Sequence, residues 1–173
     1  VEYGADGVAF VNQAAQFGLF KKIPTVIGFN TVSEPLFPVL GSKIVGFYNN
    51  IGYVHQQNYP LNTTFAAAWK AKYGSDPYYV EADNYIAAEA LFAAVKKAGS
   101  VDPNAVKTAL NGLTFDSIDG MVTMRAADHQ LLRPSNLGQV VKVPGGPGGL
   151  GWKIIDTQPA SVTSPSPNPA CHI

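Results

Sequence analysis

The sequence has little of the side-chain chemistry on which enzymes and metalloproteins usually depend. It contains one cysteine, Cys171, and three histidines among 173 residues. One cysteine cannot form an internal disulfide. A metal site needs three or four converging ligands, and no recognisable ligand spacing joins the histidines His55, His129 and His172. We therefore expect neither a bound metal nor a cofactor.

No sign of charge predominates either. The 12 basic and 12 acidic residues balance to a formal net charge of zero, and no basic run is present. This pattern argues against binding to nucleic acid or to an anionic membrane surface. No apolar run approaches the roughly 18 residues that a membrane span needs. What the chain does have is 46% hydrophobic residues, enough for a packed core.

The first third of the chain alternates helix and strand. Asp6 is typical of a helix cap, and apolar residues then recur at helical spacing as far as Leu19. Residues 23–28 are typical of a short buried strand, and residues 43–48 of a second one. A helix followed directly by an apolar strand is the repeating half-unit of an α/β sheet. We therefore predict an α/β fold.

The middle of the chain is predicted to be helical. We interpret Asn62 as the cap of a helix that places three aromatic side chains on one face, Phe65, Trp69 and Tyr73. Such a stripe lines a pocket in some proteins, but core packing is the commoner explanation at this spacing. A longer helix covers 81–98. Its predicted buried stripe consists of Tyr85, Ala88, Phe92 and Val95.

Beyond a helix that starts at Asp102-Pro103, the chain is predicted to be strand-rich. Strands are expected at 121–125, 139–143 and 152–155, with a turn-rich link over 115–120. The glycine run at 145–149 lacks the Lys-Ser/Thr ending of a phosphate loop, so we interpret it as a flexible connector.

Asp128 and His129 form the only acid–histidine pair. A hydrolase could use such a pair as base and orienting group. Adjacent residues rarely face one another, however, and no Gly-x-Ser-x-Gly elbow accompanies them. We favour a polar turn, and we expect no catalytic residue and no enzymatic activity.

Phe29, Asn30 and Thr31 are candidate binding residues because they follow the predicted strand 23–28 directly. In open α/β sheets, ligands bind beyond the carboxyl ends of the strands. A turn that simply requires Asn and Thr explains the same residues equally well at this point.

Several segments in this order resemble the Leu/Ile/Val-type solute-binding proteins of ABC transporters. The resemblance covers roughly residues 6–143. Its segments are the helix and strand over 11–28, FAAAWKAKYGSDP over 65–77, YIAAEALFAAVKKAGS over 85–100, the stretch over 115–125, and Ala-Asp-His-Gln over 127–130.

This resemblance implies a type I periplasmic-binding-protein fold, in which two Rossmann-like α/β lobes enclose a solute. The chain resembles only the C-terminal half, so we expect an incomplete fold with parts of both lobes. We assign residues 1–49 to the second lobe and 50–132 to the first. Residues 133–156 then return to the second lobe, and 157–173 form an extended tail. We expect the missing N-terminal half to be a partner, either upstream in the same protein or as a second chain.

The resemblance also implies a function and a site. Tyr3 matches an aromatic residue of the family's pocket, and Asn30 matches the acidic residue that holds the ammonium group in amino-acid binders. Because Asn30 is neutral and a buried ammonium needs a charged or strongly polar partner, we expect an aromatic or other organic acid as ligand. The implied role is periplasmic, or at least extracytoplasmic and membrane-anchored, delivery to an ABC-transporter permease. A ligand-sensing regulatory domain of the same fold is the alternative.

Overall fold

A computed structural model of the chain describes residues 4–29 and 31–171. The chain divides into two compact units and passes from one to the other three times. Unit 1 consists of residues 1–52 and 136–157, and unit 2 of residues 53–135 and 158–173. Tyr3 and Asn30, two of the four candidate binding residues, lie outside the described residues.

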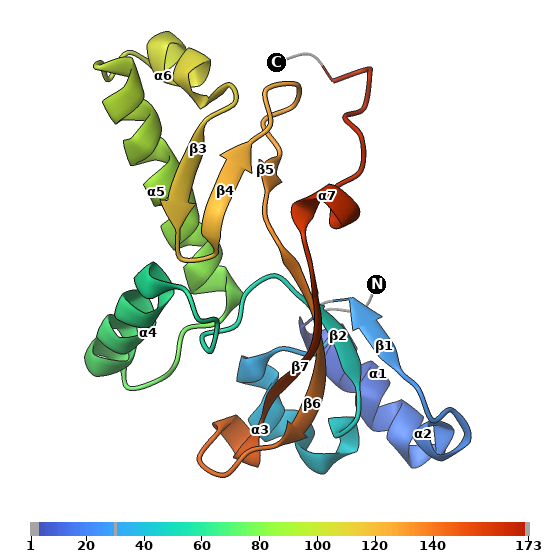
Figure 1. Cartoon of the computed structure of the whole chain (residues 1–173). Helices are drawn as coiled ribbons and strands as arrows, with labels where there is room; N and C mark the ends of the chain where they lie inside the picture. The colour runs from blue at the N-terminus through green and yellow to red at the C-terminus, as the bar shows by residue number, and fades with distance from the viewer. Residues whose placement is uncertain (1–3, 30, 172–173) are drawn as a thin grey trace. The chain divides into compact units, whose positions relative to one another are not determined.

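Unit 1 is built on a four-stranded sheet in the order β1-β2-β6-β7 (Figure 1). β1 pairs parallel with β2, which pairs antiparallel with β6. The strands are β1 (Ile27–Phe29), β2 (Tyr48–Ile51), β6 (Ser135–Lys142) and β7 (Leu150–Gln158). The helices are α1 (Gly4–Gln16), α2 (Leu19–Lys22) and α3 (Phe37–Leu40), with 3₁₀ turns at Glu34–Leu36, Gly41–Ile44 and Pro147–Gly149.

Three predictions for unit 1 are wrong. Asp6 does not cap the first helix, because α1 already includes Gly4 and Asp6 lies in its first turn. The run 43–48 is not a strand, because the 3₁₀ turn ends at Ile44 and Gly46 adopts a φ of 94°, so β2 starts only at Tyr48. A positive φ is available to glycine at no steric cost and interrupts an extended chain. The predicted strand 23–28 is also not buried, since β1 is an edge strand whose Ile27 is 71% exposed.

Unit 2 packs three helices against the antiparallel sheet β3-β4-β5 (Figure 1). The helices are α4 (Pro60–Tyr73), α5 (Tyr79–Ala98) and α6 (Pro103–Leu110), and α7 (Ala160–Thr163) follows β7. The strands are β3 (Thr114–Ser117), β4 (Gly120–Met124) and β5 (Leu131–Leu132). β3 therefore occupies part of the predicted turn-rich link. Helix α6 starts as expected, because the Asp102 carboxylate accepts from the amides of Asn104 and Ala105.

Asn62 does not cap α4. The helix starts at Pro60 with Tyr59 at the cap position, and Asn62 is fully buried one turn later. Its Nδ2 donates to the carbonyl oxygens of His55 and Gln57, at 3.0 and 2.7 Å, and its Oδ1 accepts from the hydroxyl of Tyr53. Asn62 thus fixes the loop before the helix, a task that a buried amide performs when all its bonds are made.

The buried face of α5 is also different from the one predicted. Ala82, Ile86, Ala90 and Ala94 are the residues that enter the core. Tyr85 and Phe92, predicted to be buried, are 45% and 70% exposed. The spacing of four was correct, but more than one face of the helix carries apolar residues, so periodicity alone does not identify the face that is covered.

Candidate functional site

Phe29 and Thr31 lie at the carboxyl end of β1, where an α/β sheet usually binds its ligand. Phe29 is the last residue of the strand, and its side chain is 63% exposed. Thr31 follows at the strand end and is half-buried. The neighbouring parallel strand β2 contributes Asn49, whose Cα is paired with that of Gly28. The structure therefore brings two of the predicted residues to one strand end.

Asn49 connects the two strands beyond their backbone pairing. It is 3% exposed, and its Nδ2 donates to the carbonyl oxygen of Val32 over 3.2 Å. This bond ties the segment after β1 to β2. The Oδ1 atom of Asn49 is buried and has no hydrogen-bond partner among the described residues. An unpaired buried acceptor costs free energy, which makes this strand end a candidate site.

Gly28 permits this arrangement. A Cβ atom at Gly28 would lie 3.0 Å from Oδ1 of Asn49 and 3.1 Å from both Cβ and Oγ1 of Thr31. These distances are shorter than ordinary van der Waals contacts, so any side chain at position 28 would require Asn49 and Thr31 to shift by a few tenths of an ångström. The side chains of Thr31 and Asn49 thus both lie against Gly28.

The sequence reasoning missed Asn49. Because Asn49 follows the predicted strand 43–48, it was interpreted as part of a connecting segment. The available signal was the pair Asn49-Asn50 next to apolar residues, because asparagine is depleted in strands and is retained there for a specific contact. Asn49 is a positioning residue in this structure, since its described contact is with the backbone of Val32.

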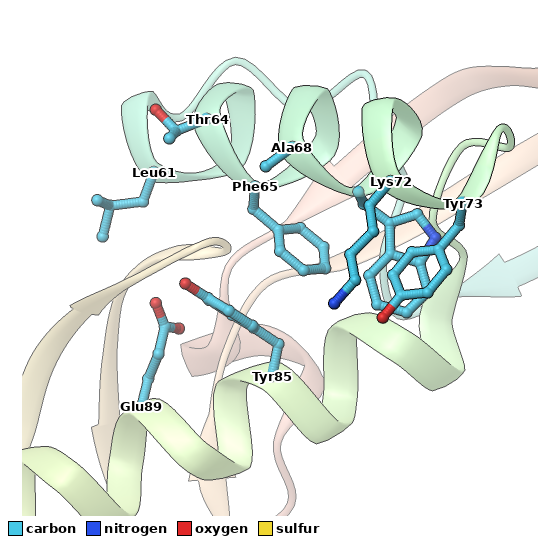
Figure 2. A pocket seen from close by; sticks show the side chains of 9 residues that line it. Leu61, Thr64, Phe65, Ala68, Lys72, Tyr73, Tyr85 and Glu89 are labelled. Atoms are coloured by element: carbon cyan, nitrogen blue, oxygen red, sulfur yellow. The ribbon is translucent and has the colours of Figure 1, made fainter.

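A second candidate is the aromatic hollow between α4 and α5, which lies entirely in unit 2. It has a volume of about 340 Å³. Figure 2 shows Phe65 pointing from α4 towards α5, with Tyr85 and Glu89 rising from α5 to meet it. The lining residues are Leu61, Thr64, Phe65, Ala68, Trp69, Lys72, Tyr73, Tyr85 and Glu89.

The aromatic stripe serves partly as core and partly as lining. The Phe65 ring is buried, with its centroid 4.5 Å from that of Tyr85 and 5.9 Å from that of Trp69. Tyr73 packs on Trp69 at 4.2 Å but is 54% exposed. The predicted core packing therefore holds at Phe65 and weakens towards the end of the helix.

Glu89 supplies the carboxylate of this hollow. Burial raises the pKa of Glu89, opposed by a hydrogen bond from the backbone of Ile118 and reinforced by the negative charges of Asp116 and Asp119. Its Oε2 atom is buried and has no partner among the described side chains and backbone groups. A half-buried carboxylate in an aromatic setting is costly to ionise.

Asp128 and His129 do not form a catalytic pair. The Asp128 carboxylate accepts two bonds from Arg125, from Nε at 2.8 Å and from NH2 at 2.6 Å, and one from the backbone of Gln130. The bond from Arg125 lowers the pKa of Asp128. The Nε2 atom of His129 instead contacts Oδ1 of Asn111 at 2.6 Å. This is the polar turn that the sequence favours.

Residues 4–29 and 31–171 contain neither a metal-binding cluster nor a membrane-spanning helix. No group of three or more His, Cys, Asp or Glu side chains is arranged to hold a metal ion. None of the helices described combines the length and the apolar character that crossing a membrane requires.

Comparison with known proteins identifies the family. The profile of the periplasmic binding protein family matches residues 1–147. The chain therefore belongs to the periplasmic binding protein family, and its α/β architecture is an incomplete type I fold. No curated protein sequence matches it significantly.

Solved structures share the fold. The chain is similar to an amino acid ABC transporter substrate-binding protein from Pseudomonas fluorescens Pf-5, with 26% identity and a TM-score of 0.80 over 94% of this chain and 45% of that one. A solute-binding protein from Rhodopseudomonas palustris BisB5, in complex with 3,4-dihydroxybenzoic acid, is 25% identical with a TM-score of 0.78 over 92% and 44%. Another from R. palustris, in complex with 4-hydroxybenzoate, has 21% identity and a TM-score of 0.79 over 92% and 44%. The chain thus spans less than half the length of these relatives.

Proposed function

We propose that this chain contributes to a solute-binding protein that delivers a small organic acid to an ABC transporter. The proposal rests mainly on the exposed Phe29 ring at the carboxyl end of β1, next to Thr31, with Asn49 bonded to the backbone of Val32. By resemblance, Tyr3 and Asn30 complete this part of the site. No covalent chemistry and no cofactor enter the proposal.

The proposed ligand class follows from the charge of the site. A bound α-amino acid brings an ammonium group, whose burial without an anionic partner costs several kcal/mol, on the order of a thousandfold or more in affinity. Asn30 is neutral, whereas an acid such as 3,4-dihydroxybenzoate carries no ammonium. Its aromatic ring suits Phe29, and its phenolic hydroxyls suit the hydroxyl of Thr31. The 25% identical relative that holds this acid supports the choice.

We also propose that the protein acts outside the cytoplasm, because the family is described as periplasmic. Its functional form includes a complementary N-terminal half, in the same polypeptide or in a second one, since similar solved chains are more than twice the length matched here. The transporter permease is the proposed downstream partner.

Site-directed variants test the proposed site. The test uses the natural form of the protein, purified from its native host. In this protein, Thr31→Val should weaken binding of 3,4-dihydroxybenzoate at least about tenfold, since loss of a hydrogen bond of about 1.4 kcal/mol has that effect. Thr25→Val is a matched control, because Thr25 is exposed before the amino end of β1. Calorimetric titration measures both. Equal affinity of the two variants would show that Thr31 makes no contribution to binding.

Asn49→Ala tests the positioning contact separately. It removes the bond to Val32 and should lower both the affinity for the acid and the free energy of unfolding, the latter by about 1–3 kcal/mol. Unchanged affinity in a destabilised variant would restrict Asn49 to a structural role.

A further inference from the structure

The chain passes between the two units three times, and the three passages start from neighbouring strands of unit 1. β2 ends at Ile51, β6 starts at Ser135 and β7 ends at Gln158. These are consecutive strands of the four-stranded sheet (Figure 1). The boundaries between the units follow positions 52, 135 and 157. All three passages therefore leave unit 1 at the same end of three adjacent strands.

One buried side chain joins these three strand ends. Asn136 of β6 is paired with Ile51 of β2 and is 3% exposed. Its Nδ2 donates to the carbonyl oxygen of Ile51 over 3.4 Å, and its Oδ1 accepts from the hydroxyl of Thr157 in β7 over 2.7 Å. Asparagine is depleted in strands, and a buried amide is tolerated where its ends are hydrogen-bonded. Asn136 therefore connects all three strands through its side chain, in addition to the backbone pairing.

An apolar contact joins the same three strands slightly further into unit 1. A Cβ atom at Gly138 of β6 would collide with Cδ1 of Ile51 and would lie 3.3 Å from Cε3 of Trp152 in β7. Because Gly138 has no side chain, the side chains of Ile51 and Trp152 occupy the space above it. Closely packed interiors transmit strain instead of absorbing it. The end of unit 1 from which the chain departs is thus held together across β2, β6 and β7.

Unit 2 holds two of the passages by a separate set of polar contacts. Arg133, on the second passage, donates from Nη1 to Oδ1 of Asp83 at 2.6 Å and to Oδ2 of Asp119 at 3.2 Å. Gln57, on the first passage, donates to Oδ1 of Asp119 at 3.0 Å. Asp119 is 2% exposed, and breaking a buried, paired charge is costly. The first and second passages are therefore fixed to unit 2 within a few residues of leaving unit 1.

We propose that Asn136 makes the three passages bend together when the units close on a solute, which makes it a positioning residue for solute binding. The proposal rests on the proposed function for the solute and for the closing motion. Two-lobed proteins commonly close by bending at a few residues where elements end. Independent bending of three passages would multiply the open conformations and lower the fraction that is competent to bind. The apparent affinity falls by that same fraction.

Thr157 is the position at which this contact can be removed without damage to the core. Its side chain is exposed, so Thr157→Val removes the bond to Asn136 and keeps the shape of the side chain. Thr157→Ser keeps the hydroxyl and should behave like the wild type. Thr114→Val is the matched control, because Thr114 is exposed in β3 of unit 2 and its hydroxyl meets that of Thr123 at 2.9 Å.

Pulsed electron–electron resonance measures the spread of distances between the units without any solute. Nitroxide labels are attached to Lys21→Cys in unit 1 and Lys107→Cys in unit 2, both at exposed positions, in a Cys171→Ser background of the natural protein from its host. We expect Thr157→Val to broaden the distance distribution and Thr157→Ser to restore the wild-type width. Equal widths in all three proteins would overturn the proposal, and so would an equal broadening in Thr114→Val.

Titration calorimetry with 3,4-dihydroxybenzoate measures the consequence for binding. Thr157→Val should weaken binding about threefold or more, and Thr157→Ser and Thr114→Val should bind like the wild type. Unchanged affinity in a Thr157→Val protein with a broadened distribution would contradict the positioning role. Broadening without binding of the acid by any of the proteins would support the coupling through Asn136 and contradict the proposed ligand class. Binding without broadening has the reverse meaning.

Discussion

The hydroxyl of Tyr53 donates to Oδ1 of Asn62 over 2.6 Å in the interior of unit 2, where both side chains are completely buried. Through its Nδ2, Asn62 also holds the carbonyl oxygens of His55 and Gln57. One amide therefore connects the start of the unit, the loop before α4 and the helix itself.

We predict that Asn62→Leu destabilises the protein by about 2–4 kcal/mol, because it removes the bond from the Tyr53 hydroxyl and the two bonds to the carbonyl oxygens of His55 and Gln57. Urea unfolding provides the measurement. Asn58→Ala, at an exposed position in the same loop, should change stability by less than about 0.5 kcal/mol. Adding Tyr53→Phe to Asn62→Leu should cost less than the sum of the two single effects, and strict additivity would contradict the described bond.

The α/β class and the family were predictable from the sequence. Both depend on patterns spread over many residues, namely the alternation of helix and strand and five motifs in order, so no single residue decides them. The role of Asn62 was not predictable, because asparagine occurs both at helix caps and at buried positions where its amide makes several hydrogen bonds. The choice between these roles depends on Tyr53, His55 and Gln57 meeting in space. Sequence spacing contains no information about that meeting.

The covered face of α5 was unpredictable for a different reason. Alanine-rich and aromatic faces of this helix are both apolar, and the core took the smaller residues, Ala82, Ala90 and Ala94 around Ile86. Small residues allow close packing on neighbouring elements.

At the candidate site, Phe29 and Thr31 were predictable from the rule that ligands bind at strand ends. Asn49 was not, because its proximity depends on its register with Gly28 in the parallel pair of strands.

Gly28→Ala should impair the candidate site specifically. The new Cβ would approach Oδ1 of Asn49 and Thr31 to about 3 Å, so both side chains must shift. We expect a stability loss of about 1 kcal/mol together with weaker binding of 3,4-dihydroxybenzoate in calorimetry.

Gly151→Ala is the matched control for that substitution. Gly151 lies on β7 of the same unit, and a Cβ atom there would lie 2.8 Å from a methyl group of Val143. We expect a comparable loss of stability without a loss of affinity. Equal affinity losses for both variants would mean that general destabilisation, and no local site at Gly28, explains the result.

Glu89→Gln should change how stability depends on pH. Burial raises the pKa of Glu89 in the folded state, so the folded protein holds this proton more tightly than the unfolded chain does. The wild type therefore loses stability as the pH rises above the ordinary pKa of glutamate and through the raised pKa of folded Glu89. The neutral variant avoids this loss, so its advantage should be absent near about pH 3 and present near about pH 7. Urea unfolding at both pH values measures the difference, and parallel pH profiles would contradict a raised pKa.

Asn30→Glu should improve the binding of amino-bearing solutes, because it supplies the carboxylate that an ammonium group requires. The matched variant Asn30→Gln keeps the side chain neutral at nearly the same size and should bring no such gain. Calorimetry with leucine measures both. An unchanged leucine profile in Asn30→Glu would mean that residue 30 does not face the bound solute.

The most direct test of the proposed function is a comparison of solutes on the wild-type protein as its host produces it. Titration calorimetry with 3,4-dihydroxybenzoate, 4-hydroxybenzoate and leucine under identical conditions should give saturable binding of an aromatic acid and none, or far weaker binding, of leucine. Tight binding of leucine with no response to either aromatic acid would contradict the ligand class inferred from the neutral Asn30 and the exposed Phe29.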